Sequence, residues 1–267
     1  MNYYNEYDTH AAEWLRKLIA AGEIPPGDVD TRSITEISTH DLTGYTQHHF
    51  FAGIGGWPLA LRLAGWPDSR PVRTGSCPCQ PFSVAGRMLA EEDERHLWPV
   101  FRDLITFGEP TETFGEQVAG AAGLQWLEGV AEDMEGRGYA FAAAILPACA
   151  YGARHERKRI FWAANPRRTR QQRSIEHNGV SRRPREAQSV SGDALADARR
   201  YLLASGPSLL PSYGVSVSVA RRALKGFGNA IVPEVGASFV TAYLDATEHQ
   251  GDPRPSRAVG SSVWLAL

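Results

Sequence analysis

A glycine-rich turn between a short strand and a short helix constrains the fold of this chain more than any other feature. Residues 50–57 read Phe-Phe-Ala-Gly-Ile-Gly-Gly-Trp, after a predicted strand over 46–51 and before a predicted helix over 58–63. Glycine lets backbone approach a ligand and lets the helix pack closely on the strand. The unit predicts an α/β domain, although such a turn occurs in dinucleotide-binding proteins and in plain tight turns alike.

A second turn, stiffened by proline, carries a candidate nucleophile. Residues 75–83 read Gly-Ser-Cys-Pro-Cys-Gln-Pro-Phe-Ser after a predicted strand over 71–74. Cys79 therefore follows the carboxyl end of a strand, where open α/β sheets place their active sites. A lone cysteine is more often buried and inert, and a nucleophilic thiolate needs a nearby cation or helix N-terminus. The remaining cysteines, Cys77 and Cys149, support neither an ordinary disulfide nor a zinc site.

Composition is that of an ordinary globular protein. The 267 residues are 43% apolar, enough for one large domain or a domain with a small satellite, with no run of membrane-spanning length. The absence of a signal-peptide pattern, together with three cysteines, favours a reducing cytoplasm. The net charge is only −2, so a nucleic-acid surface must be local, and 25 of the 28 basic residues are arginines, which suit bidentate contacts to phosphate or guanine.

Two predicted strands that end in acidic residues precede the glycine turn. Residues 5–8 read Asn-Glu-Tyr-Asp and lead into a helix for which Thr9 is the expected N-cap, and residues 27–30 read Gly-Asp-Val-Asp. A carboxylate at a strand end can bind the hydroxyl pair of a ribose, but usually that strand follows the glycine turn. The simpler interpretation of residues 5–8 is a helix cap.

Three motifs follow the cysteine turn. A predicted strand over 113–118 contains Glu116, and a strand over 139–146 precedes Cys149, which we expect to be buried. Residues 151–161 carry alternating charges, so that Arg157 and Arg159 are expected on one side of a strand, with Lys158 opposite. Residues 227–235 contain the third motif, Gly-Asn-Ala-Ile-Val-Pro.

As a set these motifs resemble those of the cytosine-5 DNA methyltransferases. Pro-Cys-Gln-Pro-Phe-Ser matches the catalytic loop of that family, Phe-Ala-Gly-Ile-Gly-Gly its cofactor turn, and Gly-Asn-Ala-Ile-Val-Pro its returning segment. The resemblance implies a doubly wound, mostly parallel α/β sheet, the S-adenosylmethionine-dependent methyltransferase fold, with a small target-recognition region. It gives catalytic roles to Cys79, Glu116, Arg157 and Arg159, and cofactor contacts to Glu6, Tyr7, Asp28, Phe51, Gly53, Gly55, Gly56 and Asn229.

Within that resemblance some positions depart from the family pattern. Gln117 stands where the family has asparagine after the glutamate, and His155 replaces the glutamine that precedes the two arginines. The resemblance implies that Asp28 accepts a hydrogen bond from the adenine amino group of the cofactor. Asp30 is the competing candidate for that role. These departures leave the reactive residue types in place, so the resemblance still implies a methyl transfer to cytosine.

The order of the motifs departs as well. In the family the glycine turn comes first, then Asn-Glu-x-Asp, then Gly-Asp-Ile, then the cysteine loop, whereas here the two acidic segments come first and only 23 residues separate Gly56 from Cys79. We therefore predict a circular permutation. The strand ending at Glu6 should lie beside the strand ending at Phe51. A right-handed crossover would move the helix after Trp57 to the other face of the sheet, unless its linker bends instead.

The resemblance also implies a domain organisation and partners. Residues 1–163 would form the catalytic and cofactor-binding domain, 164–222 a short target-recognition region, 223–247 a returning segment, and 248–267 a loose tail. The recognition region has seven arginines and one acid between Arg167 and Arg185, as expected for phosphate contacts.

The implied activity is the transfer of a methyl group from S-adenosylmethionine to carbon 5 of cytosine in double-stranded DNA, through a cysteine adduct on a flipped base. The expected protein is a cytoplasmic monomer of prokaryotic or phage origin, without metal or membrane. An RNA cytosine methyltransferase and a non-catalytic cofactor sensor are the alternatives.

Overall fold

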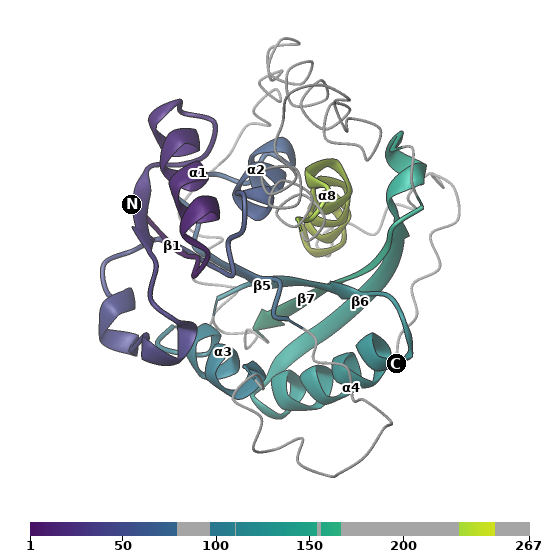
Figure 1. Ribbon diagram of the computed structural model, residues 1–267. Helices are drawn as coiled ribbons and strands as arrows, with labels where there is room; N and C mark the ends of the chain where they lie inside the picture. The colour runs from purple at the N-terminus through teal and green to yellow at the C-terminus, as the bar shows by residue number, and fades with distance from the viewer. Residues whose placement is uncertain (79–96, 110, 154–155, 167–229, 249–267) are drawn as a thin grey trace, which may run out of the picture.

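The computed structural model describes residues 1–78, 97–109, 111–153, 156–166 and 230–248 (Figure 1). The strands are β1 (Asn2–Asn5), β2 (Gly27–Asp30), β3 (Gln47–Phe50), β4 (Val72–Gly75), β5 (Thr113–Val118), β6 (Tyr139–Pro147) and β7 (Lys158–Pro166). The helices are α1 (Thr9–Ala20), α2 (Gly56–Leu63), α3 (Trp98–Ile105), α4 (Ala121–Gly136) and α8 (Pro233–Glu248), with 3-10 turns η1 (Ile34–Glu36), η2 (Thr39–Leu42) and η3 (Ala148–Tyr151). Among the helices of these described ranges, none has both the length and the apolar character needed to span a membrane.

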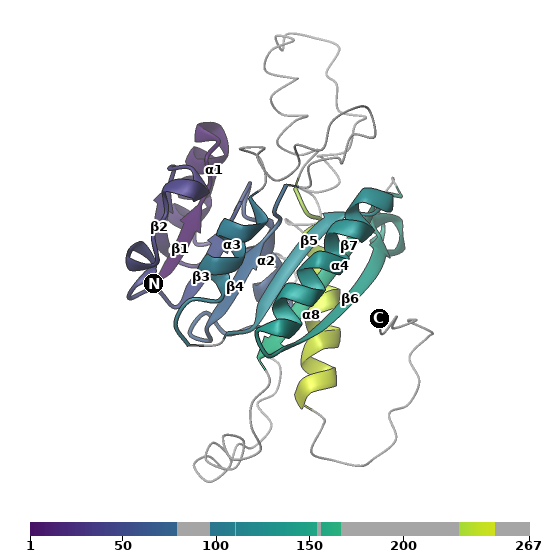
Figure 2. The same cartoon turned by 90° about the horizontal axis from the view of Figure 1, so that it is seen from below.

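Seven strands form one sheet in the order β2-β1-β3-β4-β5-β7-β6. The first five pair in parallel, and β7 runs antiparallel to both of its neighbours. Helices α1, α2 and α8 cover one face, while α3 and α4 cover the other (Figure 1), and Figure 2 shows α3 and α4 on the near side of the sheet. The predicted doubly wound, mostly parallel α/β fold is thus confirmed.

The first strand of the chain lies inside the sheet. β1 pairs in parallel with β2 on one side and with β3 on the other, with Tyr4 opposite His49. The prediction that the strand leading to Glu6 lies beside the strand leading to Phe51 is confirmed. Because parallel neighbours end at the same edge, the segments after β1 and β3 emerge together.

The connections between strands do not all have the same hand. From β1 to β2 the chain moves toward the β2 edge with α1 on one face; from β3 to β4 it moves the opposite way, yet α2 lies on that same face (Figure 1). The shared face is also evident from packing, because Leu15 of α1 and Leu59 of α2 meet in one apolar cluster. Two such connections have opposite hands. Helix α2 therefore lies on the same face as α1, through a connection of the opposite hand.

The remaining connections identify which of the two is unusual. The β2–β3 connection carries η1 and η2, whose Ile34 and Leu42 pack in the same cluster as Phe101 of α3 on the opposite face. This connection and β4–α3–β5 move toward the β6 edge over that face, so both share the hand of β1–α1–β2. Since right-handed crossovers are strongly preferred, we assign β3–α2–β4 as the left-handed one.

Glycines in the central strands make room for large aromatic rings. A Cβ on Gly115 would lie 2.0 Å from the Trp162 ring, and one on Gly75 would lie 2.4 Å from the Phe101 ring. Both aromatic side chains are fully buried. The close packing of α3 on β4, and of the Trp162 ring of β7 beside β5, therefore depends on the missing side chains, because interiors have no spare volume for an added carbon.

Two local expectations from the sequence are wrong. Asp8, not Thr9, is the N-cap of α1, and its carboxylate accepts hydrogen bonds from the backbone N–H groups of His10 and Ala11. Cys149 is exposed rather than buried, because the chain turns into η3 after β6 and places Ala148 at the buried position.

Candidate active site

Three chain segments leave the sheet at the same level. The β3–β4 register places Phe50 opposite Gly75, and the β4–β5 register places Gly75 opposite Gly115. The residues that follow are the glycine turn, the start of the cysteine segment, and Glu116. Elements far apart in the sequence therefore converge at the carboxyl edge of the central strands, where open α/β sheets bind their ligands.

The glycine turn has the backbone conformation that glycine allows. Phe51, Gly53 and Gly55 have φ values of 48°, 55° and 86°, and Gly55 is the N-cap of α2. A Cβ on Gly56 would lie 2.5 Å from Ile231. The segment that begins the returning helix therefore packs directly against the turn, as the resemblance implied. The ring of Phe51 packs edge-on against Phe101, with centroids 5.4 Å apart.

Glu6 and the glycine turn lie in direct contact. One carboxylate oxygen of Glu6 accepts a hydrogen bond of 2.7 Å from the backbone N–H of Gly53, and the other accepts one of 2.8 Å from that of Asp8. Burial raises the pKa of Glu6, and the two N–H groups oppose that rise. Each oxygen has a further lone pair, so the carboxylate can still accept from a ligand. The adjacent Tyr7 is 73% exposed, with its ring at the surface.

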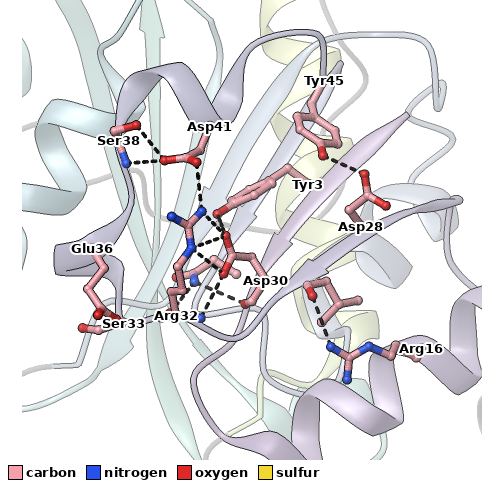
Figure 3. Close-up of polar contacts among 12 residues, drawn as sticks. Tyr3, Arg16, Asp28, Asp30, Arg32, Ser33, Glu36, Ser38, Asp41 and Tyr45 are labelled. Carbon is pink, nitrogen blue, oxygen red and sulfur yellow. Dashed lines mark hydrogen bonds and ion pairs between the residues drawn. The ribbon is translucent and has the colours of Figure 1, made fainter.

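The two competing aspartates of β2 differ in position and in partners (Figure 3). Asp30 pairs with Asn5 at the carboxyl edge, and its carbonyl accepts from the backbone N–H of Glu6, whereas Asp28 pairs with Tyr3, two residues behind that edge. The carboxylate of Asp28 accepts a hydrogen bond of 2.6 Å from Tyr45.

The carboxylate of Asp30 is held by two neighbours. The Tyr3 hydroxyl donates to it at 2.8 Å, and the Arg32 guanidinium lies 2.6 Å away and also reaches Asp41 at 3.0 Å (Figure 3). Burial tends to raise the pKa of Asp30, but the hydrogen bonds from Arg32 and Tyr3 lower it overall. Asp30 is therefore a carboxylate anchored at the edge next to Glu6.

Glu116 is a buried carboxylate that faces two arginines. The residue is 5% exposed, and Oε1 lies 2.8 Å from Nε of Arg159. Burial raises the pKa of Glu116, and the charges of Arg159 and Arg157 oppose that rise. Oε1 forms this ion pair but has no aligned hydrogen-bond donor among the described residues. The carboxyl group can therefore form a further hydrogen bond with a ligand that lies next to it.

The arginine pair does not lie on one strand as expected. β7 begins at Lys158, so Arg157 precedes the strand, with a φ of 29°, and its guanidinium donates to the carbonyl of Ala230 at 2.7 Å. Arg159 is the strand residue that pairs with Glu116. The expected alternation is wrong because the backbone turns at Arg157, which joins the arginine motif to the returning segment instead.

Gln117 makes a contact that the sequence did not indicate. Its side-chain amide donates to the carbonyl of Cys77 at 3.1 Å, and its side-chain oxygen accepts from the backbone N–H of Val118. The longer side chain at this position thus fastens the first residues of the cysteine segment to β5. Cys79, Asn229 and residues 167–222 of the expected recognition region lie outside the described residues, as do residues 249–267 of the expected tail.

Comparisons with known proteins point to one family. The family described as C-5 cytosine-specific DNA methylase matches residues 71–205. The type II methyltransferase M.AplI of Arthrospira platensis is 34% identical over 104 residues, which are 38% of this chain and 29% of that protein. M.HgiCII of Herpetosiphon aurantiacus is 26% identical over 152 residues, 42% of this chain and 35% of that protein. The chain thus spans about a third of the length of these curated relatives.

Among solved structures, the S. pombe Dnmt2 methyltransferase matches with a TM-score of 0.49 and 11% identity, covering 92% of this chain and 98% of that chain.

Proposed function

Because the chain belongs to the C-5 cytosine-specific DNA methylase family, we propose that it transfers a methyl group from S-adenosylmethionine to carbon 5 of cytosine in double-stranded DNA. The proposal rests on the register of β3, β4 and β5, which brings three chain segments to the same level at the carboxyl edge of the sheet. The glycine turn after Phe50, the cysteine segment after Gly75 and the carboxylate of Glu116 emerge side by side. A methyl donor, a nucleophile and a target base can therefore meet there.

The residues at the glycine turn fit the proposed cofactor. Glu6 would hold the ribose hydroxyls, the turn from Gly53 to Gly56 would face the methionine end, and the exposed ring of Tyr7 would lie against the adenine. Support comes from the contact between Glu6 and Gly53, because one carboxylate then stands beside the backbone that a ligand approaches most closely. S-adenosylmethionine supplies an electrophilic methyl group when bound.

For the adenine amino group we propose Asp30 rather than Asp28. The strand register is held by backbone hydrogen bonds and places Asp30 at the edge, whereas Arg32, with a side chain 45% exposed, can turn away and keep Asp41 as its partner. Asp28 has fewer partners but lies behind the edge. The position of Asp30 at the edge therefore counts for more than the ion pair that its carboxylate forms with Arg32.

The two assignments can be separated with a cofactor analogue that carries a 6-oxo group in place of the adenine amino group. We expect the protein to bind S-adenosylhomocysteine at least about tenfold more tightly than S-inosylhomocysteine, because a carboxylate accepts a hydrogen bond from the 6-amino group, whereas the 6-oxo group is itself an acceptor. Asp30→Asn should bring the ratio of the two dissociation constants, measured by calorimetry, close to one. Asp28→Asn serves as the matched control, and a loss of discrimination in that variant instead would return the assignment to Asp28.

In the proposed reaction the thiolate of Cys79 attacks carbon 6 of an extruded cytosine and forms a carbon–sulfur bond. Electron density moves to carbon 5, which would take the methyl group as its bond to the sulfonium sulfur of S-adenosylmethionine breaks and S-adenosylhomocysteine leaves. Glu116 hydrogen-bonds ring nitrogen 3 as the ring gains negative charge, and Arg159 holds the carboxyl group in place. Loss of the carbon-5 proton to a base then expels the thiolate and restores the double bond.

We also propose that the order of the structural units is permuted relative to the family. Three observations support it: β1 lies between β2 and β3 in the sheet, the family match begins at residue 71, and α2 crosses over with the unusual hand. A rearrangement that keeps the packing of α1, α2 and α8 intact would leave α2 on the same face of the sheet. The strand before it, β3, would then connect through α2 to a different neighbouring strand, β4. The left-handed connection follows from that history rather than from any local preference.

A labelled-methyl assay tests the proposed function. We expect tritium from S-adenosylmethionine to enter duplex DNA, and bisulfite sequencing of DNA from cells that express the protein to reveal protected cytosines. Label in transfer RNA but not in DNA would identify an RNA methyltransferase on the same fold. Cofactor binding without transfer to either nucleic acid would identify a binding protein and refute the proposal.

A further inference from the structure

An arginine just before β7 connects the arginine motif to the glycine turn. The guanidinium of Arg157 donates a hydrogen bond of 2.7 Å to the backbone carbonyl of Ala230. The next residue, Ile231, lies against the turn, because a Cβ on Gly56 would be 2.5 Å from its side chain and 3.4 Å from its carbonyl oxygen. Two contacts therefore lead from Arg157 to the turn at which the cofactor is proposed to bind.

Apolar packing surrounds the contact between Ile231 and the turn. Ile231 is 6% exposed and belongs to the apolar cluster that contains Trp57 of α2 and Phe161 of β7. The rings of Trp57 and Phe161 meet edge-on, with their centroids 6.0 Å apart. The carbonyl to which Arg157 donates belongs to the residue directly before Ile231. The polar contact therefore holds the backbone at the point where the returning segment enters the apolar layer.

The backbone of Arg157 has a strained conformation. Its φ of 29° lies in the left-handed region, which residues with a side chain rarely adopt. Such a conformation costs free energy, persists only where the surrounding structure determines it, and is concentrated at functional sites. A hydrogen bond from a charged donor is about twice as strong as one between neutral groups, so the contact with Ala230 can offset part of that cost.

We propose that Arg157 is a positioning residue for the cofactor site, because its hold on the carbonyl of Ala230 keeps Ile231 packed against the glycine turn. The inference rests on the proposed function, since that function places the cofactor at this turn. The two arginines of the motif then have different roles. Arg159 pairs with the carboxylate of Glu116 at 2.8 Å and serves the target base, whereas Arg157 acts on the cofactor through the returning segment.

The two roles predict different losses. In Arg157→Ala we expect the dissociation constant of S-adenosylhomocysteine, measured by calorimetry without DNA, to rise about tenfold, because the segment that packs on Gly56 loses its hydrogen bond. In methyl transfer to duplex DNA, kcat/KM for the cofactor should fall about tenfold more than kcat. Arg159→Ala is the matched control from the same motif. It should lower kcat while the dissociation constant stays within about twofold.

Two further substitutions of Arg157 separate its side chain from its backbone. Arg157→Gly adopts the positive φ without strain but has no side-chain donor, so it should weaken cofactor binding as much as Arg157→Ala does. Arg157→Lys keeps a cationic donor and should bind S-adenosylhomocysteine to within about threefold of the unmodified protein. If Arg157→Gly bound as tightly as the unmodified protein, the guanidinium would have no part in positioning and the inference would be wrong.

The outcomes distinguish this inference from the proposed function. Unchanged affinity in Arg157→Ala, or a loss confined to kcat, would overturn the positioning role in a protein that still binds the cofactor. If the unmodified protein bound S-adenosylhomocysteine but transferred no methyl group, the proposed function would fail, while the comparison of affinities would still decide the role of Arg157.

A substitution on the other side of the contact keeps the test valid if Arg157→Ala fails to fold. Ile231→Val removes one methyl group from the side chain that packs on Gly56. We expect the dissociation constant of S-adenosylhomocysteine to rise about threefold in this variant, because the turn loses part of its packing. An unchanged dissociation constant would show that the returning segment does not act on the cofactor site, and the inference would then be wrong.

Discussion

Replacement of Cys79 by alanine is expected to abolish methyl transfer, by at least about 10³-fold, while cofactor affinity stays within about twofold. Carbon 5 of cytosine is a poor nucleophile until a group adds to carbon 6, and a methyl side chain cannot add. The proposed cofactor site is formed by the glycine turn and Glu6, so cofactor affinity should not depend on the sulfur. Calorimetry with S-adenosylhomocysteine and single-turnover transfer from labelled cofactor measure the two quantities separately.

The adduct itself can be trapped. Duplex DNA with 5-fluorocytosine at the target has no carbon-5 proton to lose, so the thiolate cannot be expelled after methyl transfer. We expect the unmodified protein to form a DNA complex that survives denaturing electrophoresis, and Cys79→Ala to form none. Cys149→Ala is the matched control, because Cys149 is exposed on η3 after β6. A trapped complex in Cys79→Ala would refute the nucleophile assignment.

Strand positions and strand ends were predictable from the sequence because each left a local signal. Short segments bounded by turn residues predicted β3, β4, β5 and β6 to within a residue or two of their observed ends. The position of β1 beside β3 could be predicted as well, but only from the resemblance and the order of the motifs. No periodicity within residues 2–5 indicates a central strand rather than an edge strand.

The contacts that complete the candidate site left weaker signals. Trp57 was expected to be core, and it is buried. Its N–H donates to the hydroxyl of Ser76 at 3.2 Å, a contact that depends on where α2 packs. Ser76 offered one clue, a hydroxyl between a strand end and the cysteine turn. Arg157 left none: neither its φ of 29° nor its contact with Ala230, 73 residues away, is signalled by the charged run around it. Tertiary packing decides such features, and the local sequence does not encode them.

The hand of the β3–α2–β4 connection shows how packing overrides a local preference. α2 meets the segment just before α8 at Gly56, where a Cβ would lie 2.5 Å from Ile231, and it meets α1 next to Gly55, where a Cβ would lie 3.0 Å from Leu18. Moving α2 to the other face would lose both contacts and expose their apolar surface. The unfavourable crossover costs free energy in one connection, whereas burial between these helices stabilises the fold at two interfaces.

Glu6→Ala is expected to weaken binding of S-adenosylhomocysteine by roughly 10²–10⁴-fold, because two hydrogen bonds from ribose hydroxyls to a charged group contribute about 1.5–3 kcal/mol each. A point substitution is a sharper test than deletion of residues 1–30, since β1 and β2 belong to the sheet and their loss would unfold it. Calorimetric titration with S-adenosylhomocysteine measures the affinity. Glu13→Ala is the matched control, an exposed glutamate on α1 that lies close in sequence.

Glu6 also accepts from the backbone of Gly53 and Asp8, so loss of its carboxylate could act through the turn alone. Glu6→Gln separates the two effects, because the amide keeps one acceptor oxygen for the turn but presents an N–H₂ group to a ribose hydroxyl. If ribose contact dominates, Glu6→Gln should lose most of the affinity while its melting temperature stays near that of Glu13→Ala. Unchanged affinity in Glu6→Ala would remove the ribose assignment, and with it the functional case for a unit moved to the start of the chain.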